Sequence, residues 1–201
     1  MTTDRRLRIA VADDEPDVLL FFRELLPSLG YEVVAEAASG PELVQCCRAT
    51  HPDLVITDIR MPGLDGLQAA AQINQDVRVP VILVTAHHDA DVLARAAADY
   101  VMAYLSKPVK PVDLEAAIRM ALVRFSHFQT LAREAADLRQ ALEDRKVIER
   151  AKGAVVKRVG VDEEEAFRRL RKLASDDNRK LAEAAQQVVA AEEVFRRLDR
   201  G

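Results

Sequence analysis

The chain lacks tryptophan and is poor in aromatic residues, which make up 4% of its 201 residues. It also lacks a long apolar run, since no stretch approaches the roughly 20 residues that a membrane-spanning helix needs. The first residues hold no apolar signal core, because Asp13, Asp14 and Glu15 interrupt it. We therefore expect a soluble, cytoplasmic protein without a membrane partner.

Cysteine is nearly absent as well. Cys46 and Cys47 are neighbours in the chain, and this spacing is too short for a structural disulfide between them. We expect both to be reduced, partly buried residues of a helix.

Charge is distributed unevenly along the chain. Residues 1–138 contain 13 Lys and Arg against 20 Asp and Glu, whereas residues 139–201 contain 16 against 13. An acidic N-terminal part and a mildly basic C-terminal part predict two units with different partners.

Five short apolar runs alternate with helical patterns in the first part of the chain. This alternation predicts an α/β fold with a doubly wound, five-stranded parallel sheet that is covered on both faces. The expected strands are 7–12, 31–37, 53–58, 79–85 and 103–106, and the expected helices are 16–29, 41–49, 67–73 and 90–98, with another from Val112.

Polar residues follow these strands at the edge where their carboxyl ends collect, namely Asp13, Asp14, Asp58, Thr85 and Lys107. Each alone is an ordinary cap or turn residue, but five on one edge indicate a site. Converging carboxylates need a compensating cation, and Mg²⁺ takes oxygen ligands while leaving room for a phosphoryl group. Asp58 is the candidate nucleophile, with Thr85 and Lys107 placed to bind phosphoryl oxygens.

The motifs around these residues closely resemble those of response-regulator receiver domains. The resemblance covers residues 6–125 and is carried by Ala12-Asp13-Asp14-Glu15, Asp58, Met61-Pro62-Gly63-Leu64-Asp65-Gly66, Val84-Thr85-Ala86 and Ala103-Tyr104-Leu105-Ser106-Lys107-Pro108. It implies that a sensor histidine kinase phosphorylates Asp58. It also implies Mg²⁺ held by Asp14, Asp58 and the backbone carbonyl of Arg60, with Asp13 assisting through water.

The same resemblance assigns the switch. Thr85 would be the switch hydroxyl, Tyr104 the coupled aromatic residue and Lys107 the phosphate partner, with a cis peptide bond at Lys107–Pro108. Tyr100 stands where many receivers have Gly, and we expect it to reshape the loop and the switch surface beside it.

One further substitution and a pair of histidines carry less meaning. Val109 replaces a common Phe, a packing change of little consequence. His87 and His88 follow Thr85 and are expected to be surface residues rather than metal ligands.

From Val112 to Lys152 there is neither Gly nor Pro, which predicts that the last receiver helix continues as a signalling helix. Apolar residues recur at alternating spacings of three and four, typical of a coiled coil. The seam consists of Leu114, Ala117, Ala121, Phe128, Leu131, Ala135, Leu138 and Leu142, with Arg124 as its polar member. It packs either on the chain's own C-terminal helices or on a second chain, as a homodimer. The linker is expected at 126–142.

Two further helices are expected beyond Gly160. Asp162 and Glu165 predict a capping box, and Asp177-Asn178 predicts the cap of the last helix. The middle helix would turn Ala166, Phe167, Leu170, Leu173 and Ala174 inward. The result would be a bundle of three helices decorated with basic residues, a pattern typical of a solvated face or of nucleic-acid binding.

This part of the chain resembles the ANTAR output module, a three-helix RNA-binding domain that prevents transcription terminators from forming. The resemblance covers residues 138–192 and rests on Arg145–Gly153, Glu165–Arg171, Ala174, Asn178, Leu181, Ala182 and Ala185. We expect the output domain at 143–197. The expected RNA-binding residues are Arg145, Lys146, Arg150, Lys152, Arg168, Arg171, Arg179 and Lys180. Because Phe167 and Phe195 both fit apolar faces, we expect phosphate contacts and shape readout rather than stacking.

The sequence therefore predicts a non-enzymatic response regulator of a two-component system, controlled by phosphorylation, which binds RNA stem-loops as an antiterminator. Two alternatives stay open. One is a DNA-binding response regulator with a helix-turn-helix tail. The other is a receiver with a tail for protein interaction or dimerisation.

Overall fold

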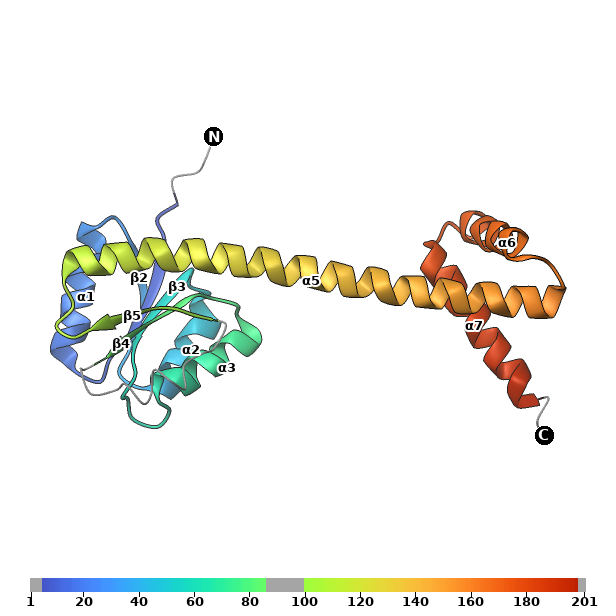
Figure 1. Cartoon of the computed structure of the whole chain (residues 1–201). Helices are drawn as coiled ribbons and strands as arrows, with labels where there is room; N and C mark the ends of the chain where they lie inside the picture. Colours follow the sequence, from blue (N-terminus) through green and yellow to red (C-terminus); the bar gives the residue numbers. More distant parts are fainter. Residues whose placement is uncertain (1–4, 86–99, 199–201) are drawn as a thin grey trace. The chain divides into compact units, whose positions relative to one another are not determined.

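The structure is a computed structural model that describes residues 5–85 and 100–198. It divides into two compact units, residues 1–130 and 131–201. The long helix α5 (Pro111–Val159) contributes residues to both units (Figure 1). The helix expected at 90–98, together with His87 and His88, lies outside the described residues.

The first unit is the predicted five-stranded parallel sheet with helices on both faces (Figure 1). Its strand order is β2-β1-β3-β4-β5, and every neighbouring pair is parallel. The winding reverses between β1 and β3, which is where open parallel sheets place their sites. The strands are β1 (Arg8–Ala12), β2 (Glu32–Ala37), β3 (Leu54–Asp58), β4 (Val81–Thr85) and β5 (Val101–Ser106), and the helices are α1 (Pro16–Ser28), α2 (Gly40–Thr50) and α3 (Gly66–Asp76).

The sheet separates two hydrophobic cores. On β1, Ile9 and Val11 belong to the core under α1 and α5, whereas Ala10 and Ala12 belong to the core under α2 and α3. Every residue of β3 and β4 is buried, because helices cover both faces of these central strands. Cys46 and Cys47 are free thiols in α2, as predicted. Burial raises the pKa of the Cys47 thiol to about 12.

The loop after β3 is fixed by a close approach of backbone to backbone. The Gly66 N–H donates to the Ile59 carbonyl at 2.8 Å, and a Cβ on Gly66 would overlap the carbonyl oxygen of Asp58. The side chains of Asp65 and Gln68 then form a reciprocal capping box at the start of α3. This packing holds the end of β3 in place.

The second unit is the predicted bundle of three helices, made of the later part of α5, α6 (Glu163–Asp176) and α7 (Leu181–Leu198). Its core is small, with Ala151, Leu170 and Ala185 at the centre. Although α5 is 49 residues long, neither it nor any other described helix has an apolar stretch long enough to cross a membrane.

Two predictions about this unit were wrong. Phe167 and Leu173 are 36% and 37% exposed instead of facing inward, because the buried stripe of α6 is the narrower set Ala166, Leu170 and Ala174. Asn178 does not cap α7. It adopts a positive φ of 52° and ends α6, while the Arg179 N–H returns to the Ala174 carbonyl.

The predicted seam on α5 also divides into two parts. Leu114, Ala117 and Ala121 are buried in the core of the sheet, so this part of the seam is receiver packing rather than coiled coil. Leu131, Leu138 and Leu142 are 64%, 72% and 53% exposed. Within the described residues, these three leucines therefore do not pack on α6 and α7.

The close approach at Gly66 yields a stability prediction. Gly66→Ala should lower the free energy of unfolding by about 1–3 kcal/mol, because the new methyl group forces the Asp58 carbonyl to move. Gly153→Ala is the control, since nothing lies within 4 Å of its added Cβ, and in the interior of α5 it should stabilise by about 0.5–1 kcal/mol. Urea unfolding of the full chain measures both. Equal effects of the two substitutions would contradict this account of the loop.

Candidate functional site

The carboxyl edge of the sheet brings the predicted site residues together. Asp13 follows β1, Asp58 ends β3, Thr85 ends β4 and Lys107 follows β5. The Lys107 Nζ lies 2.9 Å from Asp13 Oδ2 and 3.3 Å from Asp58 Oδ1. Asp13 is fully buried, and Asp58 and Thr85 are 6% and 5% exposed.

Glu15 is a member of this cluster that the sequence did not reveal. Its Oε1 lies 2.9 Å from Lys107 Nζ. In the sequence, Glu15 is only part of the motif that follows the first strand, and in the structure it stands at the N-cap of α1. The acidic run from Asp13 to Glu15 was the one available signal. Lys107 therefore faces three carboxylates.

Burial decides the direction of the pKa shift for the two aspartates of this cluster, whereas ion pairs decide it for Lys107. Burial raises the pKa of Asp58, and the Lys107 charge and the Arg60 N–H only partly offset it. Burial likewise raises the pKa of Asp13 despite its contact with Lys107. Burial opposes the charge on Lys107, but its contacts with Asp13 and Glu15 outweigh that effect and raise its pKa. In this cluster, burial disfavours the charged form of the two aspartates, while their contacts favour the protonated form of Lys107.

The backbone orients the two central side chains. The Arg60 N–H donates to Asp58 Oδ2 at 2.7 Å, which leaves Oδ1 directed toward Lys107. The Lys107 N–H donates to the Thr85 carbonyl at 2.9 Å, and the Lys107–Pro108 peptide is cis, as predicted. Tyr104 lies on β5 with 39% of its surface exposed.

The donor set suits a hard divalent cation. Asp13 Oδ2 is buried and, among the described residues, contacts the Lys107 ammonium in an ion pair. Carboxylate oxygens of this kind are what Mg²⁺ prefers. Asp14, however, is exposed, and the described part of the chain contains no group of three acidic, His or Cys side chains arranged to hold a metal. Ligation by Asp14 and by the Arg60 carbonyl stays a prediction.

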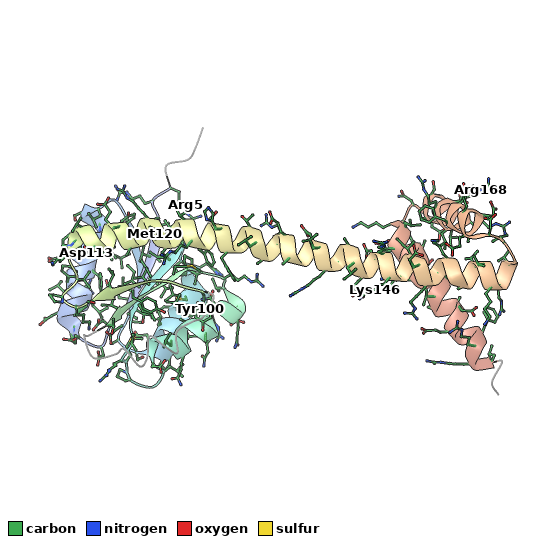
Figure 2. The ribbon with its side chains drawn as sticks, viewed as in Figure 1. Arg5, Tyr100, Asp113, Met120, Lys146 and Arg168 are labelled. Carbon is green, nitrogen blue, oxygen red and sulfur yellow. The ribbon has the colours of Figure 1, made fainter. Side chains whose placement is uncertain are left out.

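Several of the predicted RNA-binding side chains are engaged by carboxylates of the second unit. Arg150 pairs with Glu193 at 3.0 Å, and Lys146 pairs with Glu143 at 2.7 Å. Arg168 pairs with Glu165, and Figure 2 shows Arg168 projecting from α6. Arg145, Arg171, Arg179 and Lys180 make no ion pair within the described residues.

Lys152 is the member of the predicted set that is least available. Its side chain is 15% exposed and reaches Glu149 at 3.0 Å and Glu163 at 3.4 Å. It therefore ties α5 to the first turn of α6. We assign Lys152 a structural contact in this unit.

Comparison with known proteins matches both units. Residues 9–119 match the response regulator receiver domain, and residues 136–189 match the ANTAR domain. The chain belongs to the ANTAR response regulators. The transcriptional regulatory protein PdtaR of Mycobacterium tuberculosis is 37% identical over 182 residues, which cover 90% of this chain and 89% of that protein. Both matched domains are regulatory, and this relative is a transcriptional regulator rather than an enzyme.

Solved structures match the receiver unit. A response regulator receiver domain protein from Clostridium thermocellum superposes with a TM-score of 0.54 at 35% identity, covering 59% of this chain and 95% of that one. A two-component response regulator of the LuxR family from Aurantimonas gives a TM-score of 0.52 at 35% identity, covering 59% of this chain and 86% of that one.

This regulator accommodates its two departures from the receiver pattern within its cores. Tyr100 (labelled in Figure 2) packs partly buried against the core under α2 and α3, and its carbonyl accepts the Val81 N–H at 2.9 Å. Val109 packs partly buried against the opposite core. The effect of Tyr100 on the switch surface stays a prediction.

The raised pKa of Asp58 predicts how removing its charge changes the free energy of unfolding. The folded chain holds the Asp58 proton more tightly than the unfolded chain, so this group's contribution to stability is lost as pH rises through its folded pKa. At pH 7 without Mg²⁺, Asp58→Asn should raise the free energy of unfolding by about 1 kcal/mol, and the gain should disappear below pH 4. Urea unfolding at both pH values measures it. The exposed Asp14→Asn is the control and should change stability by less than about 0.5 kcal/mol.

Lys107→Ala should act in the opposite direction. Without the ammonium group, Asp13 and Asp58 lose their buried counter-charge, and the free energy of unfolding at pH 7 should fall by about 3 kcal/mol. If Asp58→Asn destabilises as much as Lys107→Ala, the described charge balance is wrong.

Proposed function

We propose that Asp58 accepts a phosphoryl group from a sensor histidine kinase and that its phosphorylation controls binding of RNA stem-loops by the ANTAR domain. The observation that carries the proposal is the placement of Asp58 between the Arg60 N–H and the Lys107 ammonium. This site lies in a chain whose second unit matches the ANTAR domain.

The geometry supports nucleophilic attack by one defined oxygen. Asp58 Oδ2 is held by the Arg60 N–H, whereas Oδ1 faces Lys107. In the proposed step, Oδ1 bonds to phosphorus, the phosphorus–nitrogen bond of a phosphohistidine breaks, and the imidazole leaves with the electron pair. The Lys107 ammonium balances charge on the transferred oxygens.

Receiver domains generally bind Mg²⁺ at this position, and we propose that Asp13, Asp14, Asp58 and the Arg60 carbonyl would hold it here. The ion would neutralise charge on the phosphoryl oxygens. The chain's own contribution is to keep two carboxylates buried and oriented.

The switch that follows is proposed from the neighbouring strands. The Thr85 hydroxyl would bind a phosphoryl oxygen, and the exposed Tyr104 ring would then turn inward beside it. Because α5 starts shortly after Lys107 and is continuous to Val159, a change at this edge reaches the helix that leads into the ANTAR domain. We propose the domain limits 6–125, 126–142 and 143–197.

For RNA, the unpaired basic residues Arg145, Arg171, Arg179 and Lys180 are the first candidates for phosphate contacts. Among residues 5–85 and 100–198 they make no ion pair that RNA would have to break. Arg150, Lys146 and Arg168 are exposed side chains that pair with carboxylates, and pairs of exposed cations contribute little to stability, so these three residues can also turn to RNA. Phosphate contacts of this kind predict strongly salt-dependent binding.

We test the central proposal with acetyl phosphate and Mg²⁺ on the full chain. The wild type should gain one phosphoryl group by mass spectrometry and change its affinity for hairpin RNA, whereas Asp58→Asn should do neither. A pool of hairpins with a fixed stem and randomised loop serves as the RNA. The same assay with duplex DNA at several salt concentrations tests the rival function, and tighter binding to the duplex would overturn RNA as the target.

We also propose that the chain forms a homodimer through the exposed seam of α5. Leu131, Ala135, Leu138 and Leu142 keep the spacing of a coiled coil, and the three leucines are largely exposed. Burying leucines against a second copy would contribute about 1.5–3 kcal/mol for each.

Leu138→Lys combined with Leu142→Lys should weaken dimerisation at least about tenfold, since charged side chains would replace two seam leucines. Analytical ultracentrifugation with and without acetyl phosphate measures it. Leu198→Lys is the matched control, because Leu198 is 70% exposed, like Leu138 at 72%, but lies on α7. A wild type that stays monomeric in both states at micromolar concentration would refute the dimer.

A further inference from the structure

The outward side of α6 forms a surface hollow of about 590 Å³. Glu164, Phe167, Arg168 and Arg171 line it at spacings of three and four, which places them on one side of the helix. Asp162, Glu165 and Lys172 complete its lining. The opposite stripe of α6, which includes Leu170, is buried in the bundle. The hollow therefore combines an aromatic ring with charges of both signs.

Phe167 is available to a ligand. It is 36% exposed and lies outside the hydrophobic core of the second unit. A single exposed Phe is ordinary on a protein surface. What distinguishes Phe167 is its place in a hollow lined by acidic residues that precede it in the chain and by basic residues that follow it.

The charges of this hollow differ in their availability. Arg168 and Arg169 both pair with Glu165, and the Asp162 side chain accepts the Glu165 N–H at 2.8 Å as the cap of α6. Within the described residues, Glu164, Arg171 and Lys172 make no ion pair. One carboxylate and two cations around an aromatic ring thus face solvent without an ion-pair partner in the described part of the chain.

This combination matches the chemistry of an unpaired nucleotide. A base removed from its stack presents a π face to an aromatic side chain. A carboxylate accepts a hydrogen bond from an exocyclic amino group of a base. Arg and Lys neutralise the flanking phosphates. In a duplex the base faces are covered by their neighbours, whereas RNA loops expose them.

We propose that the hollow on α6 binds one splayed, amino-bearing base of an RNA loop. The base stacks on Phe167 with its amino group toward Glu164, and the adjacent phosphates contact Arg171 and Lys172. The inference rests on the proposed RNA binding and assigns its site of base recognition. It also replaces the expectation from sequence that readout occurs through phosphates and shape alone.

Phe167→Leu of the full chain tests the stacking contact. The probe is the tightest hairpin selected by wild type from a pool with a fixed stem and a randomised loop. Phe167→Leu should weaken its binding about 5- to 100-fold, the range for losing one base–aromatic stack. Phe195→Leu is the matched control, because Phe195 is 44% exposed but lies on α7, where the Arg158 guanidinium covers its ring. It should bind like wild type.

Abasic hairpins then separate stacking from folding. The loop is synthesised with one base removed at a time. At one position, wild type and Phe167→Leu should bind the abasic hairpin equally, because the stacked base is gone. If the difference between them persists for every abasic hairpin, Phe167 supports the fold and the inference fails. Circular dichroism of both variants provides a second check on folding.

Two substitutions test the polar contacts. Glu164→Gln should reduce the preference for cytosine or adenine over uracil at the stacked position about tenfold, since a carboxylate accepts from an amino group more strongly than an amide oxygen does. Arg171→Ala should lower the slope of log affinity against log salt by about one. Unchanged base preference in Glu164→Gln would overturn the amino contact.

The outcomes distinguish this inference from the broader proposal. If wild type binds no hairpin in the pool, RNA binding itself is refuted. If wild type binds but Phe167→Leu binds equally well, only the site on α6 is refuted. If Phe167→Leu retains RNA binding but loses a protein partner, the hollow is a protein interface and the inference is wrong.

Discussion

The contact on which the site depends is that of the Lys107 ammonium with three carboxylates. Asp13 and Asp58 lose solvation when the sheet and helices close over them, and burial raises the pKa of both. Lys107 makes that burial tolerable by supplying the opposite charge within 3.3 Å of each. The sheet order brings the three residues together, because β1 and β3 are neighbours at the switch point and β5 ends on the same edge.

This arrangement also makes the site sensitive to added charge. Lys107 lies nearer to Asp13 and Glu15 than to Asp58, so a phosphoryl group on Asp58 would compete with two existing partners. A ligand shifts a conformational equilibrium only by its difference in interaction with the two states. We propose that an exchange of Lys107 partners would supply that difference in this chain. The Lys107 N–H donates to the Thr85 carbonyl, so such an exchange would act directly on the ends of β4 and β5.

The sheet and the identity of most site residues could be predicted because they follow from local patterns. Strand lengths, the Pro62-Gly63 turn and the position of Asp58 at a strand end all lie in short stretches of sequence. The contact of Glu15 with Lys107 joins residues 92 positions apart and depends on how far an exposed side chain reaches. Phe167 was placed wrongly because it lies at the margin of the apolar stripe of α6, where helical periodicity does not decide orientation.

The charges of the output unit show why a basic surface does not by itself define a binding site. Lys152 holds α5 to the start of α6 through Glu163, so its removal would perturb a bundle whose fully buried core is only Ala151, Leu170 and Ala185. Arg171 makes no such ion pair within the described residues. If a Lys152 substitution abolished RNA binding, the loss could come either from a disturbed fold or from a missing RNA contact. Substitutions of Arg171 and Phe167 test the RNA contact itself. Recognition by this unit is best sought where charge is not already used to hold its helices together.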